Sequence, residues 1–282
     1  MNKRLLAPAA LVAGALPLLL AAAPAQAQGF MSNAFIPPGQ ETFSIDLGGV
    51  ANRFDSHVRL NGQTTQGSDI NLENNDLDRN LSTFIVAATW RFLPNHRLDA
   101  LYYGGKRSGS RTYEGNIDIG DQDFPVGATV GLDTKTEIFD LNYRWSFVHT
   151  PQVELAAVLG LYGGTFKYDF AAVGTVNGTQ RTYNKSVSTT IPLPVIGLSV
   201  DWYLDPRWRV SAMGAGIKAD IGDVNGHAYV LSVSTDYMVW RNLGFGARYG
   251  YTDISADVSK SDFNGNLGVK LNGVSLYARF VF

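Results

Sequence analysis

The side chains most able to do chemistry in this chain are four histidines, two of which lie close to candidate partners. His57 directly follows Ser56, and His227 has Asp220 and Asp223 nearby in the sequence. Adjacent residues of a strand face opposite ways, so Ser56 and His57 would not meet there. Neither histidine completes a set of nucleophile, base and orienting group. The sequence therefore predicts no catalytic residues and no enzyme.

The polar segment SDINLENNDLDRN, residues 68–80, is rich in the oxygen ligands that Ca²⁺ prefers. Its spacing begins like an EF-hand loop, but Asn74 stands where the glycine of such a loop is required, so we expect a solvated loop. The absence of cysteine excludes thiolate metal sites and disulfides. GAGIKADIG, residues 214–222, has no third glycine in register and no following helix, which excludes a dinucleotide site. No cofactor and no metal are predicted.

The overall composition points to a β-structure without a nucleic-acid partner. The 282 residues include 30 glycines and only 17% charged residues, which suits an all-β protein with close backbone approaches. The formal net charge is -2, which gives no electrostatic reason to expect nucleic acid as a partner.

The N-terminal 27 residues have the features of a secretory signal peptide. A basic start is followed by an apolar run from Leu5 to about Pro24 and then by the small-x-small site Ala25-Gln26-Ala27. We expect cleavage after Ala27, a short periplasmic segment at 28–41 and the folded domain at 42–282. The alternative is an uncleaved N-terminal membrane anchor.

These candidate residues must be positioned by strands, because the chain alternates with period two. In the last strand one face carries Val274, Leu276, Ala278, Phe280 and Phe282, and the other face carries small, polar or charged residues. The same alternation recurs along the chain and gives ten strands. They are 42–52, 80–92, 97–107, 133–148, 153–168, 188–204, 207–220, 227–240, 243–254 and 268–282.

The connections between these strands alternate between short and long. The short ones often contain proline, and the long ones, at roughly 53–79, 108–132, 169–187, 221–227 and 255–267, are rich in Gly, Asn, Asp, Ser and Thr. Eight strands would remain if 97–107 and 207–220 are misread. Twelve would result if the long loops conceal strands, with 113–119 as the first candidate.

Long antiparallel strands in an even number, with short turns on one side, describe a membrane-spanning barrel. With the signal peptide and the C-terminal LYARFVF, the sequence resembles Gram-negative outer-membrane β-barrel proteins of the small OmpA/OmpX-like class. The resemblance implies a closed antiparallel up-and-down transmembrane β-barrel in the cell outer membrane. It also implies that the C-terminal strand, with Phe280 and Phe282, is read by the outer-membrane assembly machinery.

The tryptophans fit the interface zone of such a barrel. Amphipathic rings are enriched where lipid meets water. All five lie near the short turns, which predicts an aromatic girdle of Trp90, Trp145, Trp202, Trp208 and Trp240. The alternative is packing inside a soluble sandwich.

The inward faces of the strands carry balanced charge. Isolated charges in a barrel interior are costly, so near balance predicts paired ladders and a narrow, largely occluded lumen. The predicted ion-pair network comprises Asp46, Arg91, Asp99, Asp140, Arg144, Glu154, Asp201, Arg209, Asp236, Arg248 and Arg279.

A structural or surface-interaction barrel is the function these features favour. Its expected partners are outer-membrane lipid and lipopolysaccharide, and the sequence gives no oligomeric state. A narrow pore for small solutes and a barrel enzyme acting on surface lipid or peptide are the alternatives.

Overall fold

A computed structural model describes residues 35–61, 69–73, 77–112, 114, 117–119, 122–124, 127, 129–176, 179–221, 224–259 and 264–282. The predicted signal peptide and residues 28–34 of the predicted periplasmic segment lie outside this part of the chain. Residues from Phe35 to Phe282 form one compact unit. None of the described residues belongs to a helix long and apolar enough to cross a membrane.

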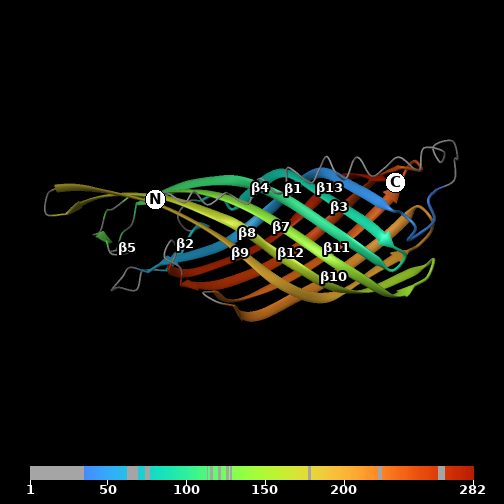
Figure 1. The fold of residues 1–282 in the computed structure, drawn as a ribbon. Helices are drawn as coiled ribbons and strands as arrows, with labels where there is room; N and C mark the ends of the chain where they lie inside the picture. Colours follow the sequence, from blue (N-terminus) through green and yellow to red (C-terminus); the bar gives the residue numbers. More distant parts are fainter. Residues whose placement is uncertain are drawn as a thin grey trace, which may run out of the picture. The chain divides into compact units, whose positions relative to one another are not determined.

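Ten long antiparallel strands form a closed ring (Figure 1). Each pairs with the next along the chain, and the last pairs with the first, which leaves the ring without an open seam at its turn end. The predicted ten-stranded up-and-down barrel is therefore confirmed. Its strands are β1 (Phe43–Leu60), β3 (Asn80–Leu93), β4 (His96–Thr112), β7 (Thr129–His149), β8 (Val153–Val176), β9 (Thr179–Tyr203), β10 (Trp208–Ile221), β11 (Val224–Met238), β12 (Leu243–Ser259) and β13 (Asn264–Val281).

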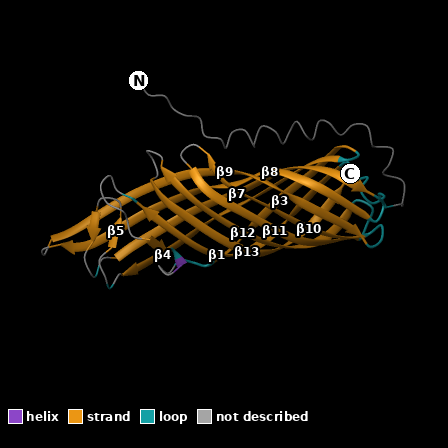
Figure 2. Cartoon of the chain, turned by 90° about the horizontal axis from the view of Figure 1, so that it is seen from below, coloured by secondary structure: helices purple, strands orange, loops and turns teal. Residues whose placement is uncertain are grey.

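The short turns lie together at one end of the barrel, as Figure 2 shows, and we call this the turn end. The chain terminus lies there too, since the amide of Thr42 donates to the carbonyl of Phe282 at 2.9 Å. The opposite end, where the long connections were predicted, is the loop end. The predicted short turns are confirmed, but the predicted long connections are wrong for three of the five loop-end links, since only residues 177–178, 222–223 and 260–263 separate the strands there.

Several predicted loops are in fact continuations of strands. In the predicted loop 169–187, residues 169–176 extend β8 and residues 179–187 extend β9, and the two strands stay paired as far as Val176 opposite Thr179. Similarly, β10 and β11 stay paired as far as Ile221 opposite Val224. The segment 113–119 contributes β5 (Ile117–Ile119), which pairs only with β6 (Gln122–Phe124) and so adds no strand to the ring. Polar outward faces hid these continuations in the sequence.

The outer surface of the turn-end half is an apolar belt. Its side chains come from alternate positions of every long strand, and the most exposed include Leu276 at 66% and Ile196 at 63%. Toward the loop end the outward positions become polar and charged, as at Lys135, Lys167 and Lys270. The change of character along each strand marks where a hydrocarbon layer would end.

At the loop end the ring opens into two facing sheets. Pairing of β3 with β4 stops at Ile85 opposite Tyr103, and pairing of β9 with β10 stops at Ile196 opposite Gly216. Beyond these points, toward the loop end, one sheet consists of β4, β7, β8 and β9. It faces a second sheet that consists of β10, β11, β12, β13 and β1. Short strand β2 (Asp69–Asn71) continues the sheet beside β1.

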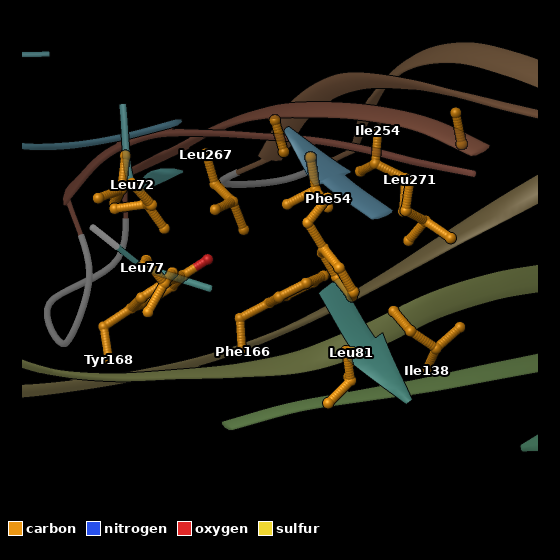
Figure 3. Close-up of a cluster of buried hydrophobic side chains, with 14 of the residues drawn as sticks. Phe54, Leu72, Leu77, Leu81, Ile138, Phe166, Tyr168, Ile254, Leu267 and Leu271 are labelled. Carbon is orange, nitrogen blue, oxygen red and sulfur yellow. The ribbon is translucent and has the colours of Figure 1, made fainter. Parts of the chain in front are cut away.

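An apolar core fills the space between the two sheets (Figure 3). Phe54 from β1 and Phe166 from β8 are each 1% exposed, and Leu72 and Leu77 enter from the segment that follows β2. We call residues 72–73 and 77–79 the inner segment. Charged side chains were predicted to fill the lumen, so this apolar layer was missed.

We expect loss of the last residue to weaken ring closure. Phe282 donates its amide to Phe43 at 2.8 Å, and its ring centroid lies 6.4 Å from that of Phe43. Deleting Phe282 should lower the fraction of heat-modifiable, membrane-inserted protein several-fold, because backbone groups at a barrel edge are costly in lipid. Truncated protein that reaches normal membrane levels would contradict this, and Phe282→Trp serves as the control that keeps the aromatic end.

Candidate functional site

Charged side chains from all ten strands converge inside the turn-end half of the barrel. They form what we call the luminal charge layer. The alternation along each strand directs these side chains into the lumen. All of them lie in the part of their strand nearest the turn end, so they meet at one height in the barrel. The members are Asp46, Arg91, Arg97, Asp99, Arg144, Glu154, Asp201, Arg209, Asp236, Arg248 and Arg279.

Glu154 is the centre of one group in this layer. Its carboxylate accepts a bidentate pair from Arg91 at 3.0 and 2.8 Å and lies 3.5 Å from Arg97. Arg97 also donates to Asp201, and the Ser146 hydroxyl donates to Glu154. Glu154 is 1% exposed, so these contacts replace the water that a carboxylate needs.

A second group joins the first and last strands of the ring. Asp46 and Arg279 are direct cross-strand neighbours, and the arginine donates to the carboxylate at 2.9 Å. Arg248 reaches the same carboxylate at 3.3 Å from β12. Beside them Arg209 donates to Asp236 at 2.6 Å, between β10 and β11. Ring closure thus coincides with a buried charge pair.

Asp99 and Asp140 differ in whether a basic side chain pairs with them. Asp99 lies 2.5 Å from Arg144 and also accepts from the Thr89 hydroxyl at 2.6 Å. Asp140 has no basic group within ion-pairing distance among the described residues, and its Oδ1 atom is buried without a hydrogen-bond donor. The structure brings ten of the eleven predicted lumen residues into ion pairs and leaves Asp140 out.

A cavity of about 150 Å³ separates the luminal charge layer from the apolar core. Asp140 and Arg144 line it on one side, while Val50, Ile85 and Leu271 line it toward the core. The lumen is therefore filled in layers, with charges at the turn end, a small mixed cavity next and apolar side chains at the loop end.

Arg97 is the member of the charge layer that the sequence prediction missed. It shares strand parity with Asp99, which was predicted to face inward, but it stands next to a turn. It is 3% exposed and bridges Glu154 to Asp201. Parity alone would have identified it, and its inclusion gives the layer six arginines against five paired acids, with Asp140 as a sixth, unpaired acid.

A second buried polar cluster, also missed, fastens the inner segment to the barrel. Glu73 accepts from the Ser56 amide and hydroxyl, each at 2.6 Å, and from Arg107 at 2.8 Å. The Arg107 guanidinium lies 4.0 Å over the Phe54 ring. Glu73 was expected in a solvated loop, and no local pattern shows that Leu72, Glu73 and Leu77 are buried. We call this cluster the Glu73 latch.

The two histidines considered for catalysis lie on the outer surface of the loop end. His57 Nε2 is 3.0 Å from the amide oxygen of Asn266, and His227 Nε2 is 3.7 Å from Asp253. Neither ring hydrogen-bonds a serine or threonine hydroxyl in the part of the chain that the structure describes, although Ser255 is the cross-strand neighbour of His227. Nor does any group of three or more His, Asp or Glu side chains in this part of the chain stand ready to hold a metal ion.

The turn end carries the tryptophans and the start of the described chain. All five tryptophans are on the outside, between 43% and 59% exposed. Before β1, the Gln40 amide donates to the Pro37 carbonyl at 3.1 Å, and Gly39 has the positive φ of 71° that this turn requires. Phe35 stacks under the Arg207 guanidinium at 4.4 Å, so this segment lies against the turns.

Comparisons with known proteins bear on the fold. No family model matches the sequence, and no curated protein matches it. Among solved structures, the outer membrane protease OmpT from Escherichia coli is similar, with a TM-score of 0.54, 12% identity and coverage of 89% of this chain and 99% of that one. The Yersinia pestis protein Ail gives a TM-score of 0.28 at 12% identity, with 83% and 98% covered. The Pseudomonas putida toluene transporter TodX gives 0.33 at 9%, with 85% and 89% covered.

The fold is that of a Gram-negative outer-membrane β-barrel. In this fold the short turns face the periplasm and the opposite end faces the cell exterior. The apolar belt on the outer surface is what crossing the hydrocarbon layer requires, and the turn-end tryptophans lie at its periplasmic border. The turn end is accordingly the periplasmic end, and the loop end is the extracellular end.

We expect Glu154→Gln to destabilise the barrel by about 3–5 kcal/mol, because it leaves the buried Arg91 without its counter-charge and removes one of the two carboxylates that pair with Arg97. The readout is the midpoint of guanidinium unfolding in lipid vesicles. The matched control is Asp140→Asn, which removes a carboxylate that has no ion pair and should leave the midpoint unchanged or raise it. Equal loss in both variants would contradict the assignment of Glu154 as a centre of the charge layer.

Proposed function

We propose that this protein is a non-conducting outer-membrane barrel that holds paired strands above the membrane for contact with other molecules at the cell surface. The observation that carries this proposal is the apolar core that fills the extracellular end of the lumen. A channel needs a continuous polar path, and fully buried side chains such as Phe54 and Phe166 stand across it.

The Glu73 latch supports the same conclusion. It buries a carboxylate and a guanidinium against each other, so release of the inner segment would expose two unpaired charges to an apolar surrounding. The inner segment is thus held in the lumen by its ion pair and by Leu72 and Leu77. An inner segment that is held in the lumen in this way favours a structural or interaction role over transport.

The periplasmic end supports closure independently. The luminal charge layer crosses the lumen from strand to strand, and the segment from Phe35 to Glu41 lies beneath it beside Arg209 and Arg279. Two unrelated barriers, one ionic and one apolar, therefore stand in series.

The extracellular surface has the character of a contact region. Beyond the apolar belt, outward positions of several strands carry charges of both signs, namely Asp55, Lys106, Lys135, Lys167, Asp257 and Lys270. Charges at this height stand where lipopolysaccharide phosphates and sugars would be, and we include lipopolysaccharide among the proposed partners. The assembly machinery, acting on the strand that ends in Phe280 and Phe282, is a further proposed partner.

We expect the purified protein to give no stable openings in a planar lipid bilayer. The ionic and apolar barriers would both have to open for ions to pass. Insertion is verified by heat-modifiable migration of the same sample. Reproducible unitary conductance would contradict the closed lumen and favour the narrow-pore alternative.

The proposal assigns no catalysis to the surface histidines. The similarity to OmpT is at 12% identity and supports the fold alone. His57 contacts an amide oxygen, and His227 lies beside an acid and the ring of Tyr229. Neither ring hydrogen-bonds a nucleophile among the described residues, so these contacts give no reason to assign catalysis to them.

Replacing His57 and His227 together by alanine should leave stability within about 0.5 kcal/mol, since exposed positions contribute little. Incubation of the parent protein and the double variant with peptide and lipid A substrates should give the same absence of product. A product formed only by the parent protein would establish the enzyme alternative.

A further inference from the structure

The ladder between β9 and β10 ends part-way up the barrel wall. These strands pair only as far as Ile196 opposite Gly216, whereas β8 and β9 remain paired as far as Val176 opposite Thr179. Above Ile196, β9 therefore pairs with β8 alone among the described residues. One edge of β9 is left open over the extracellular part of its length.

Two hydrogen bonds at the periplasmic turn establish which residues of β9 face this edge. The Tyr203 amide donates to the Gln152 carbonyl on the β8 side at 2.8 Å, and the next amide, of Leu204, donates to the Trp208 carbonyl on the β10 side at 2.9 Å. The direction alternates along an antiparallel strand. Since the register with β8 has no bulge, the even-numbered residues of β9 direct their backbone groups toward β10.

Pro192 and Pro194 explain why the ladder stops. Both are even-numbered, so the next two bonds that β9 would donate to β10 above Ile196 would need N–H groups that proline lacks. Their pairing with β8, opposite Gly163 and Leu161, is unaffected because that ladder uses the odd-numbered residues. The sequence TTIPLPVI therefore detaches β9 from β10 while keeping it on β8.

Beyond the prolines no described strand pairs with the open edge. The even-numbered residues here are Thr182, Asn184, Ser186, Ser188 and Thr190, and the first four have exposed side chains. All are small and polar. Figure 1 shows the β8–β9 hairpin extending past the ends of the other strands. An open edge with free N–H and C=O groups is a template for another strand.

We propose that the open edge of β9, from Thr182 to Thr190, binds an extended peptide segment of another protein by strand addition. This inference rests on the proposed surface-interaction role and names its site. Main-chain hydrogen bonds would supply the affinity, and the small side chains would leave the partner's sequence only loosely specified. The prolines keep β10 from occupying the edge.

The position of the prolines argues for a binding edge. Proteins that only need to block an edge place proline or charge along its exposed length. Here both prolines stand at the base, and residues 179–191 contain none. A lipid chain is the less suitable occupant, because Leu193 and Val195 fill the interior side of the base and are 2% and 1% exposed.

Amide hydrogen exchange measured by NMR gives a first test. In the free protein the amides of Thr182, Asn184, Ser186 and Ser188 should exchange at least about tenfold faster than those of the odd-numbered residues between them, which bond to β8. Protection of both sets would mean that the edge is already covered, and this would overturn the proposal.

A binding experiment supplies the second test. The probe is a fluorescein-labelled peptide with the sequence of residues 167–176, which already forms a strand against the other edge of β9. It should bind the protein in detergent and slow exchange of the even-numbered amides. The same peptide N-methylated at alternate residues should not bind. If the unmodified probe fails to bind, the edge does not accept strands and the proposal falls.

A matched pair of variants locates the binding. Asn184→Pro with Ser188→Pro removes two edge donors and repeats what Pro192 and Pro194 do naturally, so pairing with β8 should survive. Probe affinity should fall about tenfold or more for two lost hydrogen bonds. Asn184→Thr with Ser188→Thr keeps the donors and should bind as the parent does. Ser186 is left intact, since its hydroxyl and Lys167 hold the pKa of Asp169 below its usual range.

The remaining outcomes are decisive as well. Equal binding by the proline pair, with heat-modifiable migration intact, would place the peptide elsewhere and overturn the proposal. A parent dimer that the proline pair abolishes would identify a second copy as occupant and overturn the choice of a foreign peptide. Conductance in the bilayer tests the closed lumen and not the binding edge of β9. A failure of the proposed function can therefore be distinguished from a failure of the strand-addition proposal.

Discussion

Satisfaction of backbone hydrogen bonds in a medium without water is the constraint on which the rest of the structure depends. Each N–H and C=O inside the hydrocarbon layer must find a partner within the protein, and a strand can do this only in a closed ring. The pairing of β13 with β1 supplies that closure, from Val281 opposite Ser44 upward. Where the belt ends the constraint is lifted, and there the ring divides into two sheets.

Closure of the ring then determines which side chains each face of a strand can bear. One face meets lipid, and the other meets a lumen too narrow for bulk water, so inward charges must be matched against one another. The pairs Asp46–Arg279 and Arg209–Asp236 span neighbouring strands, while Glu154 and Arg97 join β8 to β4 past the intervening β7. The same charges that occlude the lumen therefore also link distant parts of the wall.

Much of this arrangement is predictable from the sequence because it is periodic. Strand parity identifies the ring, the belt and the paired members of the charge layer, and Arg97, which was left out, shares the parity of Asp99. Glu73 is not predictable in this way, since its partners Ser56 and Arg107 come from other strands and its own segment has no period. The length of β8 and β9 was missed for a related reason. Above the belt the outward face is as polar as a loop, and only the inward residues, such as Phe166 and Phe170, keep the alternation.

The two prolines of β9 show that the parity of a residue, and not only its type, determines its effect on strand pairing. A proline in a central strand normally argues against the assignment, yet β9 holds two and keeps its full register with β8. The two prolines are compatible with this register only if their backbone groups are directed toward β10, from which β9 separates. Their even numbers meet this condition. Because two prolines two residues apart remove consecutive bonds on one side and none on the other, they mark the height at which one barrel wall becomes two sheets.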